Sequence, residues 1–327
     1  MTQIAATTGT SRAPILLLLA GLLLAPALAW AQGPATRMVV FGDSLSDTGN
    51  AFIAGNAGHT AGANNTPPQY LVDALLVPSA AYPRGGHNLT NGAPWAQLLA
   101  RSMGFAANAD PALRSENPRA TNYAVAGARA YEDGINLNLS GQVGLFLEDF
   151  AGVAPPEALY VIEVGGSDVR DTLFFADFTI PGRGVQAIAA NIQLLHAAGA
   201  RRFLVWNAPD IGLIPSIRSL EPFFPGIAPT ATFVSGLFNG GLASALSQLD
   251  ALPGIRIDRF DLFTMLQSLY YTPAAFGLAE VNRPCITPNV APFKCRNPDT
   301  YLFWDGIHPT AAVHAIVAGE IEAMLAP

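Results

Sequence analysis

The chain has 327 residues; half of them are apolar and only 13% are charged, which excludes an intrinsically disordered protein. The net charge is −7, and Lys294 is the only lysine among 17 basic residues, which are scattered along the chain. Because no basic run is present, and an acidic surface suits a neutral or apolar ligand better than a polyanion, we expect no nucleic-acid partner.

The N-terminal segment 1–31 has the pattern of a cleaved export signal. Arg12 precedes a short apolar run over 15–25, and residues 29–31 read Ala-Trp-Ala, a small-x-small cleavage site. The run is interrupted by glycine and followed by proline, which disfavours an uncleaved membrane anchor. We therefore predict a bacterial Sec-type signal peptide over 1–31, and a mature chain, beginning at Gln32, that is secreted or periplasmic.

The predicted elements alternate between strands and helices. Apolar or β-branched runs predict strands at 38–41, 121–125, 158–164, 202–206 and 255–260. Helical periodicity and end signals predict helices at 94–103, 140–150, 185–198, 230–249 and 309–325. This alternation is typical of βαβ units, so we predict an α/β fold with three α/β/α layers and a mostly parallel sheet.

A long stretch at 51–91 lacks a helical or strand pattern and is rich in Gly, Asn, Ala and Pro. Such a segment inside a compact fold is often a binding loop or a lid. No linker and no internal repeat divides the rest of the chain. We therefore predict a single domain over 32–327, with a long loop inserted at about 51–91.

A small polar turn follows the first predicted strand, where residues 42–50 read GDSLSDTGN. In a parallel sheet, active groups lie beyond the carboxyl ends of the strands, so this turn can expose Ser44. A serine hydroxyl needs a neighbouring base before it can act as a nucleophile. The alternative is a turn that only caps the next helix, and we expect Asp47 and Asn50 to brace that helix.

Asp305 and His308 lie three residues apart, directly before the last predicted helix. At this spacing the carboxylate can hold the imidazole, fix its tautomer and stabilise its charged form. The alternative is that both side chains only satisfy the start of the helix. Glycine turns at Gly127 and at 165–168 can direct backbone N–H groups toward a developing oxyanion.

Cys285 and Cys295 are the only cysteines. Their even number, their close spacing and the export signal predict one disulfide that closes the loop 286–294. Two free thiols are the alternative. A metal-binding pair is disfavoured because neither a histidine nor another cysteine pair lies nearby, and we expect no metal site.

The order of these motifs closely resembles the GDSL family of esterases and lipases, also called SGNH hydrolases. Residues 42–50 match its first block, 122–128 resemble its second, and 305–310 match its last. Within the family, the chain is most similar to bacterial secreted phospholipase, lecithinase and haemolysin-like esterases. The resemblance covers nearly all of the mature chain and implies a flavodoxin-like SGNH hydrolase fold.

The resemblance also implies residue roles. Ser44 is the expected nucleophile, His308 the general base and acid, and Asp305 its orienting partner, while the N–H groups of Ser44 and Gly127 are expected oxyanion donors. The implied activity is hydrolysis of aliphatic, acylglycerol or phospholipid esters through an acyl-enzyme, without a cofactor. Expected partners are small-molecule or lipid esters; transient contact with a lipid surface is allowed for, and no obligate protein partner is expected.

Residue 167 departs from the family pattern. The family places an oxyanion asparagine in a G-x-N-D block, whereas 165–168 read Gly-Gly-Ser-Asp, so Ser167 takes its place. Loss of one such donor costs about a hundred- to a thousandfold in rate. Either Ser167 donates through a shifted loop or a water, or another donor substitutes, or the enzyme is slow. A carbohydrate O-deacetylase and a catalytically weakened binding protein are the alternative functions.

Overall fold

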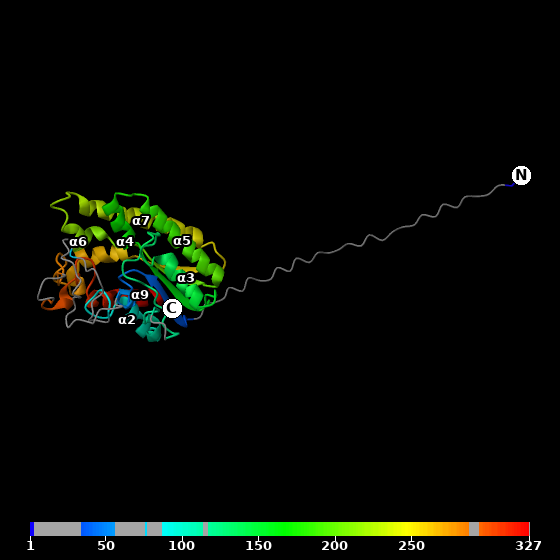
Figure 1. The fold of residues 1–327 in the computed structure, drawn as a ribbon, viewed down its shortest axis with the longest axis horizontal. Helices are drawn as coiled ribbons and strands as arrows, with labels where there is room; N and C mark the ends of the chain where they lie inside the picture. The colour runs from blue at the N-terminus through cyan, green and yellow to red at the C-terminus, as the bar shows by residue number, and fades with distance from the viewer. Residues whose placement is uncertain (3–33, 56–75, 77–86, 114–116, 288–293, 327) are drawn as a thin grey trace. The chain divides into compact units, whose positions relative to one another are not determined.

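In the part of the chain that the computed structural model describes, four parallel strands form the sheet (Figure 1). They are β1 (Arg37–Gly42), β2 (Ala158–Glu163), β3 (Arg202–Trp206) and β4 (Arg256–Phe260), adjacent in that order. All residues of β2 are buried, as expected for a central parallel strand that is covered on both faces. The register pairs Gly42 with Glu163, so the turns that follow β1 and β2 begin side by side.

The structure describes residues 1–2, 34–55, 76, 87–113, 117–287 and 294–326. Residues 3–31 of the predicted signal peptide lie outside this set, as do 56–75 and 77–86 of the predicted long loop. The elements described below all belong to the unit Gln32–Pro327.

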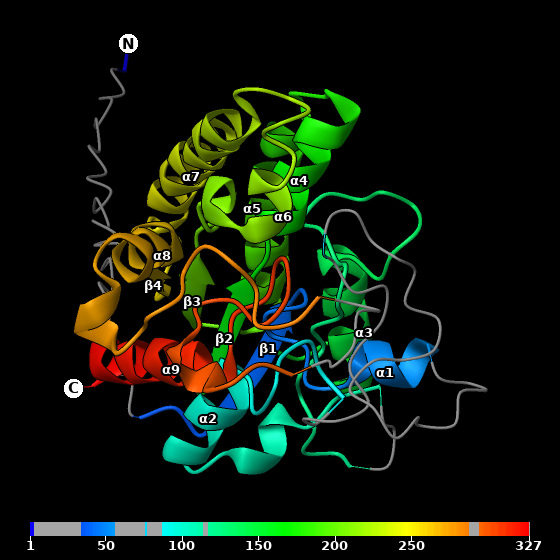
Figure 2. The same cartoon turned by 90° about the vertical axis from the view of Figure 1, so that its left-hand side faces the viewer.

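Helices cover both faces of the sheet. The α-helices are α1 (Asn50–Gly55), α2 (Trp95–Ser102), α3 (Leu139–Asp149), α4 (Gly166–Phe175), α5 (Ile180–Ala198), α6 (Pro215–Arg218), α7 (Ile227–Leu249), α8 (Leu262–Tyr271) and α9 (Ala311–Leu325). Short 3-10 turns occur at Ala106–Ala109, Ile211–Leu213, Pro273–Phe276 and Pro298–Thr300. Figures 1 and 2 show α3, α5 and α7 on one side of the sheet and α2 and α9 on the other, which gives the predicted three layers.

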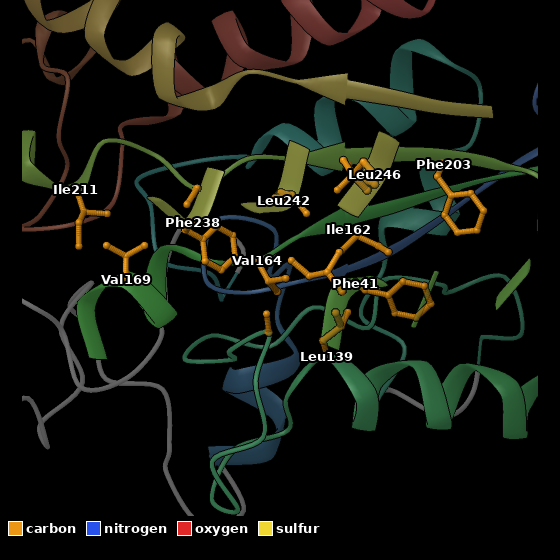
Figure 3. Packing of buried hydrophobic residues seen from close by; sticks show 14 of the residues in the cluster. Phe41, Leu139, Ile162, Val164, Val169, Phe203, Ile211, Phe238, Leu242 and Leu246 are labelled. Carbon is orange, nitrogen blue, oxygen red and sulfur yellow. The ribbon is translucent and has the colours of Figure 1, made fainter. Parts of the chain in front are cut away.

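The core forms two layers because successive strand residues point to opposite faces. On one face, Phe41, Ile162 and Phe203 share a cluster with α3, α5 and α7. Figure 3 shows Leu242 and Leu246 of α7 beside the sheet residues of this cluster. On the other face, a cluster that contains Met38, Val40, Leu159, Val161 and Leu204 packs against α2 and α9. This double burial holds the strand ends, and the turns after them, in place.

The predicted strand at 121–125 is wrong. The segment runs beside β1, but it forms only isolated bridges, one of which pairs Val40 with Asn122. The Asn122 side chain accepts a hydrogen bond from the N–H of Ala124 at 2.9 Å and donates to the carbonyl of Ser46 at 2.8 Å. Backbone hydrogen bonds still join Thr121, Tyr123 and Val125 to β1, so the segment lies along the edge of the sheet without forming a regular strand.

The other predicted strands and helices are found, with shifted ends. The helix expected at 185–198 begins earlier, at Ile180, and that expected at 309–325 begins at Ala311, where the Thr310 hydroxyl accepts from the N–H of Val313. The longer helices α4 and α8 were not predicted, and neither were the ranges of the short helices α1 and α6. For α8 a signal was present, because Asp261 accepts a hydrogen bond from the N–H of Thr264 and caps the helix.

The predicted disulfide is confirmed. Cys285 and Cys295 are bonded, with their Cα atoms 5.3 Å apart. Both residues pack in a small cluster with Leu89, Ile286 and Trp304, next to the loop that carries Asp305. The bridge closes the loop before the last motif, and the packing of this cluster holds that loop against the part of the chain that precedes α2.

Candidate active site

A cavity of about 390 Å³ opens beyond the carboxyl ends of the strands. The turns after β1 and β2, the segment at Gly127, and the loop at His308 all contribute to its wall. Ser44, Gly127, Ser167 and His308, which the sequence singled out from four separate segments, therefore line one cavity. Asp305 lies behind His308 and is fully buried.

The turn after β1 places Ser44 at the cavity. A side chain at Gly42 would put its Cβ 2.8 Å from Ser46 Cβ and 2.9 Å from the carbonyl oxygen of Glu163, so only glycine fits there. The Gln142 amide of α3 accepts from the N–H of Gly42 and donates to its carbonyl, each at 2.9 Å. These contacts hold the end of β1 rigidly, and Ser44 follows it, half-buried, on the cavity wall.

Asp305 and His308 form a buried pair. The Nδ1 atom of His308 lies 2.9 Å from Oδ1 and 2.8 Å from Oδ2 of Asp305. The same carboxylate accepts the backbone N–H groups of Ile307 at 2.9 Å and His308 at 2.8 Å. Because the carboxylate is oriented by four contacts, the ring is held with Nδ1 toward Asp305 and Nε2 directed away from it.

The Gly127 turn is attached to the serine turn by Asp47. One Asp47 oxygen accepts the N–H of Ala126 at 2.8 Å, and the carboxylate also accepts the N–H groups of Gly49, Asn50 and Ala51 at the start of α1. The expectation that Asp47 braces the first helix is thus confirmed. Gly127 itself has φ +85°, a left-handed conformation that glycine adopts without strain.

The start of α4 is hydrogen-bonded to the segment after Gly127. Asp168 accepts the N–H groups of Ala130 at 2.9 Å and Tyr131 at 3.1 Å, and its burial raises its pKa to about 7. Arg129 donates to the carbonyl of Gly127 and to Asp171. Ser167, one residue before Asp168, lines the cavity at the first turn of α4. These hydrogen bonds therefore connect the wall segment at Gly127 to the wall segment at Ser167.

Two buried acids lie next to the serine turn, and sequence reasoning missed this pair. Asp43 and Glu163 are both almost completely buried; Glu163 accepts from the hydroxyl of Ser46 at 2.7 Å. Desolvation raises the pKa of Glu163 well above its usual value, and the neighbouring Asp43 adds to this. Desolvation also raises the pKa of Asp43, while the nearby His308 and Arg170 lower it. The in-register pairing of β1 and β2 brings these acids together, which no local motif indicates.

The remaining wall was also missed at the sequence level. Asn136 and Arg170 line the cavity on its polar side. The apolar side is lined by leucine, isoleucine, valine and phenylalanine side chains, mainly from α8, α9 and the segments before α6 and His308: Ile211, Ile214, Leu262, Leu266, Leu269, Phe303, Ile307, Val313 and Val317. The helical spacing of the α8 leucines was the signal available for them.

Comparison with known proteins decides the family. A model described as GDSL-like Lipase/Acylhydrolase matches residues 38–321, which is most of the chain. This chain belongs to the GDSL-like lipase/acylhydrolase family. The predicted resemblance is thereby confirmed, and the protein is a carboxylic ester hydrolase.

Relatives of this esterase occur in plants and bacteria. A GDSL esterase/lipase of Arabidopsis thaliana is 26% identical over 330 residues, which cover 87% of this chain and 89% of the plant protein. An uncharacterized protein of the trpE-trpG intergenic region of Pseudomonas putida is 28% identical, covering 94% of this chain and 52% of that protein. The first match spans both chains almost completely.

Solved structures similar to this esterase include LAE5, an alpha/beta hydrolase enzyme from the metagenome of Lake Arreo. It aligns with a TM-score of 0.45 and 14% identity, covering 90% of this chain and 97% of that chain. The acetyl xylan esterase AlAXEase aligns with a TM-score of 0.40 and 13% identity, covering 88% of this chain and 98% of that chain.

Two general features of the described residues complete the site. Within them, no group of three or more His, Cys, Asp or Glu side chains is placed to hold a metal ion. No helix in the same part of the chain is long and apolar enough to cross a membrane.

Proposed function

We propose that this esterase is a serine hydrolase in which Ser44 is the nucleophile, His308 the general base and acid, and Asp305 the group that orients His308. The observation that carries the proposal is the buried contact between His308 Nδ1 and the Asp305 carboxylate, at 2.8 and 2.9 Å, on the cavity that Ser44 also lines. Such a contact keeps the proton on Nδ1 and leaves Nε2 as the basic nitrogen.

The reaction proceeds through an acyl-enzyme. Ser44 Oγ attacks the ester carbonyl carbon while His308 Nε2 takes the hydroxyl proton, and the Asp305 carboxylate stabilises the imidazolium that forms. The tetrahedral intermediate breaks its bond to the alcohol oxygen, which receives the proton from Nε2. A water molecule then gives a proton to His308 and attacks the acyl carbon, and Ser44 Oγ departs as the proton returns to it.

The oxyanion is stabilised by backbone donors. Within the described residues, neither the N–H of Ser44 nor that of Gly127 has a hydrogen-bond partner, and both residues line the cavity. Free N–H groups held by a rigid turn are what a developing oxyanion requires. The network through Asp47, Arg129 and Asp168 supports this role, because it ties the two turns together before substrate binds.

Ser167 supplies the third oxyanion donor. It occupies the family's asparagine position on the same cavity, and its hydroxyl makes no hydrogen bond to another described residue. The hydroxyl is shorter than an asparagine amide, so it donates directly or through one water. We therefore infer an active enzyme with a weakened third donor rather than a binding protein.

Export and contact with a lipid surface belong to the same proposal. The Cys285–Cys295 disulfide supports an oxidising compartment, in agreement with the N-terminal pattern at 1–31. Exposed phenylalanines lie on α4, α7 and the segments beside them: Phe174, Phe175, Phe178, Phe223, Phe224 and Phe233. The helices α4 and α6 both pack against α7, so the elements that carry these residues are neighbours (Figure 2). Such a patch favours transient contact with a lipid surface.

The test compares the wild type with Ser44→Ala and with Ser247→Ala, in which an exposed serine of α7 is removed as a matched control. We expect hydrolysis of p-nitrophenyl acetate by the wild type and by Ser247→Ala, and a loss of about a millionfold in kcat for Ser44→Ala. A fluorophosphonate should label the wild type at Ser44 only. Turnover that survives in Ser44→Ala, or an unlabelled Ser44 in an inactive wild type, would overturn the proposal.

A further inference from the structure

A row of buried hydrogen bonds runs beneath the serine turn. The indole N–H of Trp95 donates to the hydroxyl of Ser46 at 3.2 Å, and that hydroxyl donates to the Glu163 carboxyl at 2.7 Å. Glu163 is in turn hydrogen-bonded to the side chain of Asp43. These four residues are at most 4% exposed, so their polar groups depend on one another rather than on water.

Asp43 fixes the residues on either side of Ser44. Its own N–H donates to the carbonyl of Glu163 at 3.1 Å, and its carboxylate accepts the N–H of Leu45 at 3.0 Å. Because Asp43 and Leu45 flank Ser44 in the chain, the position of the Ser44 hydroxyl depends on where the Asp43 carboxylate is held.

The hydrogen bond between the two acids requires a proton. Two ionised carboxylates repel one another, and neither has a hydrogen to donate. His308 and Arg170 favour the charged form of Asp43, whereas Glu163 faces another acid and a hydroxyl. The proton therefore resides on Glu163 and the charge on Asp43. In agreement, burial and the neighbouring Asp43 raise the pKa of Glu163 well above its usual value.

We propose that Glu163 is a positioning residue for the nucleophile: its protonated carboxyl donates to the Asp43 carboxylate, and this bond holds Ser44 at the cavity. The inference rests on the proposed role of Ser44. Loss of the proton at alkaline pH places two negative charges directly behind the turn, so repulsion replaces the hydrogen bond and the turn shifts. Activity should then fall. Deprotonation of His308 does not explain such a fall, because the neutral imidazole is the form that accepts the Ser44 proton.

The experiment replaces Glu163 and measures kcat and KM for p-nitrophenyl butyrate from pH 6 to 10. In Glu163→Gln the amide donates to Asp43 at every pH, and its oxygen still accepts from Ser46, so it imitates the protonated acid. We expect its kcat at pH 7 to lie within about threefold of the wild type and to persist to pH 10, where the wild type should have lost more than about tenfold. Glu163→Ala removes the donor and should lower kcat about a hundredfold at every pH, with KM nearly unchanged.

The matched controls are Glu157→Gln and Glu157→Ala, which change an exposed glutamate directly before β2 and should keep the wild-type profile. Uncatalysed hydrolysis is subtracted at each pH, and circular dichroism distinguishes a shifted turn from an unfolded chain. Coincident pH profiles of the wild type and Glu163→Gln, or equal losses of kcat in Glu163→Gln and Glu163→Ala, would overturn the inference.

Infrared spectroscopy tests the proton without turnover, and it needs only variants that keep the side-chain shape. The difference spectrum between the wild type and Glu163→Gln at pH 8 should contain the carbonyl band of a protonated carboxylic acid. The corresponding difference for Glu157→Gln should lack that band, because an exposed glutamate is ionised at this pH. Absence of the band from the first difference spectrum would overturn the inference even if Glu163→Ala does not fold.

The failure of this inference and the failure of the catalytic proposal give different results. If Ser44→Ala retains turnover, the catalytic proposal has failed, and with it the role given to Glu163, whatever the infrared band shows. If Ser44→Ala is inactive but the band is missing or the pH profiles coincide, only the inference about Glu163 has failed.

Discussion

The polar end and the apolar end of the cavity are stabilised by different interactions. At the polar end, Asp305, Asp47 and Asp168 each accept two or more backbone N–H groups and hold short turns in single conformations. At the apolar end, Leu266 and Val317 are aliphatic and belong to two different core clusters, so the shape depends on how α8 and α9 pack into the core. Hydrogen bonds have strict geometry, whereas aliphatic packing tolerates substitution at a modest cost.

This difference indicates which end of the cavity determines the rate of the chemical step and which determines stability and substrate choice. Changes at the polar end should alter the rate of the chemical step by large factors, because its donors and acceptors act on the transition state. Changes at the apolar end should alter stability and substrate choice by smaller amounts. The following predictions, from the largest expected effect to the smallest, test that division.

Among these predictions, the largest effect is expected for Asp305→Asn. An asparagine keeps the shape but no longer stabilises the imidazolium, so kcat should fall by about 10⁴ with little change in KM. Steady-state kinetics on p-nitrophenyl acetate measure this, and Asp299→Asn, an exposed aspartate on the preceding segment, is the control. A fall below tenfold would remove Asp305 from the proposed triad.

Asp168 should make the polar end pH-sensitive. Its pKa is about 7 in the folded protein and 3.8 in the reference state, so the unfolded chain releases this proton first as the pH rises. The stabilising contribution of the protonated form is therefore present below about pH 4 and is lost as the pH rises through 7, by up to roughly 4 kcal/mol. Urea unfolding of wild type and Asp168→Asn at pH 4 to 8 measures it: the stability of the wild type relative to Asp168→Asn should fall as the pH rises. A constant difference would contradict the raised pKa.

Gly127→Ala should slow the reaction by about a hundredfold. The added methyl group has space, since the nearest atoms lie 3.7 and 3.9 Å away, but φ +85° is unfavourable for alanine and the N–H should turn away from the oxyanion. Gly104→Ala, with φ +80° and no atom within 4 Å of the added methyl, carries the same backbone strain away from the cavity. Equal losses of kcat in both variants would show that only folding is affected.

At the apolar end, Leu269→Ala should act on stability. The side chain is 1% exposed, and its truncation should lower the free energy of unfolding by about 2 kcal/mol, less than for a fully packed leucine because it already borders a hollow. Urea unfolding measures the loss, with the exposed Leu194→Ala of α5 as the control. A loss as small as that of the control would mean that Leu269 is not part of the packed core.

The smallest effect is expected at Ser167. Ser167→Asn should raise kcat about tenfold by restoring a longer donor, and Ser167→Ala should lower it by a similar factor. Both variants are assayed with p-nitrophenyl acetate. Because both changes are made at the same residue, at the first turn of α4, the difference in kcat between them reports on the donor at this position. If neither variant changes kcat, the third donor comes from another residue.

Local sequence signals were sufficient for much of the site. The Gly42–Asn50 turn, the Gly127 turn and the pair Asp305 and His308 could be predicted because each is formed by residues close in sequence, whose hydrogen bonds and backbone conformations are local. The buried strands β1, β2 and β3 were predicted from their apolar runs. At 121–125 the apolar pattern predicted a full strand, whereas the segment is joined to β1 by backbone hydrogen bonds of Thr121, Tyr123 and Val125 and forms only isolated bridges.

The sequence by itself determined the strand and helix alternation, the family motifs, and the pairing of the only two cysteines. Only the tertiary structure decided which of these motifs share a cavity, that Asp43 and Glu163 form a buried pair, and that residues of α8 and α9 line the apolar side of that cavity. The physical reason is the separation in sequence between the residues that interact. Turns and caps are stabilised by neighbours a few residues away, whereas Glu163 lies 120 residues beyond Asp43, and Val317 lies 51 beyond Leu266. Strand register and helix packing alone bring such residues together.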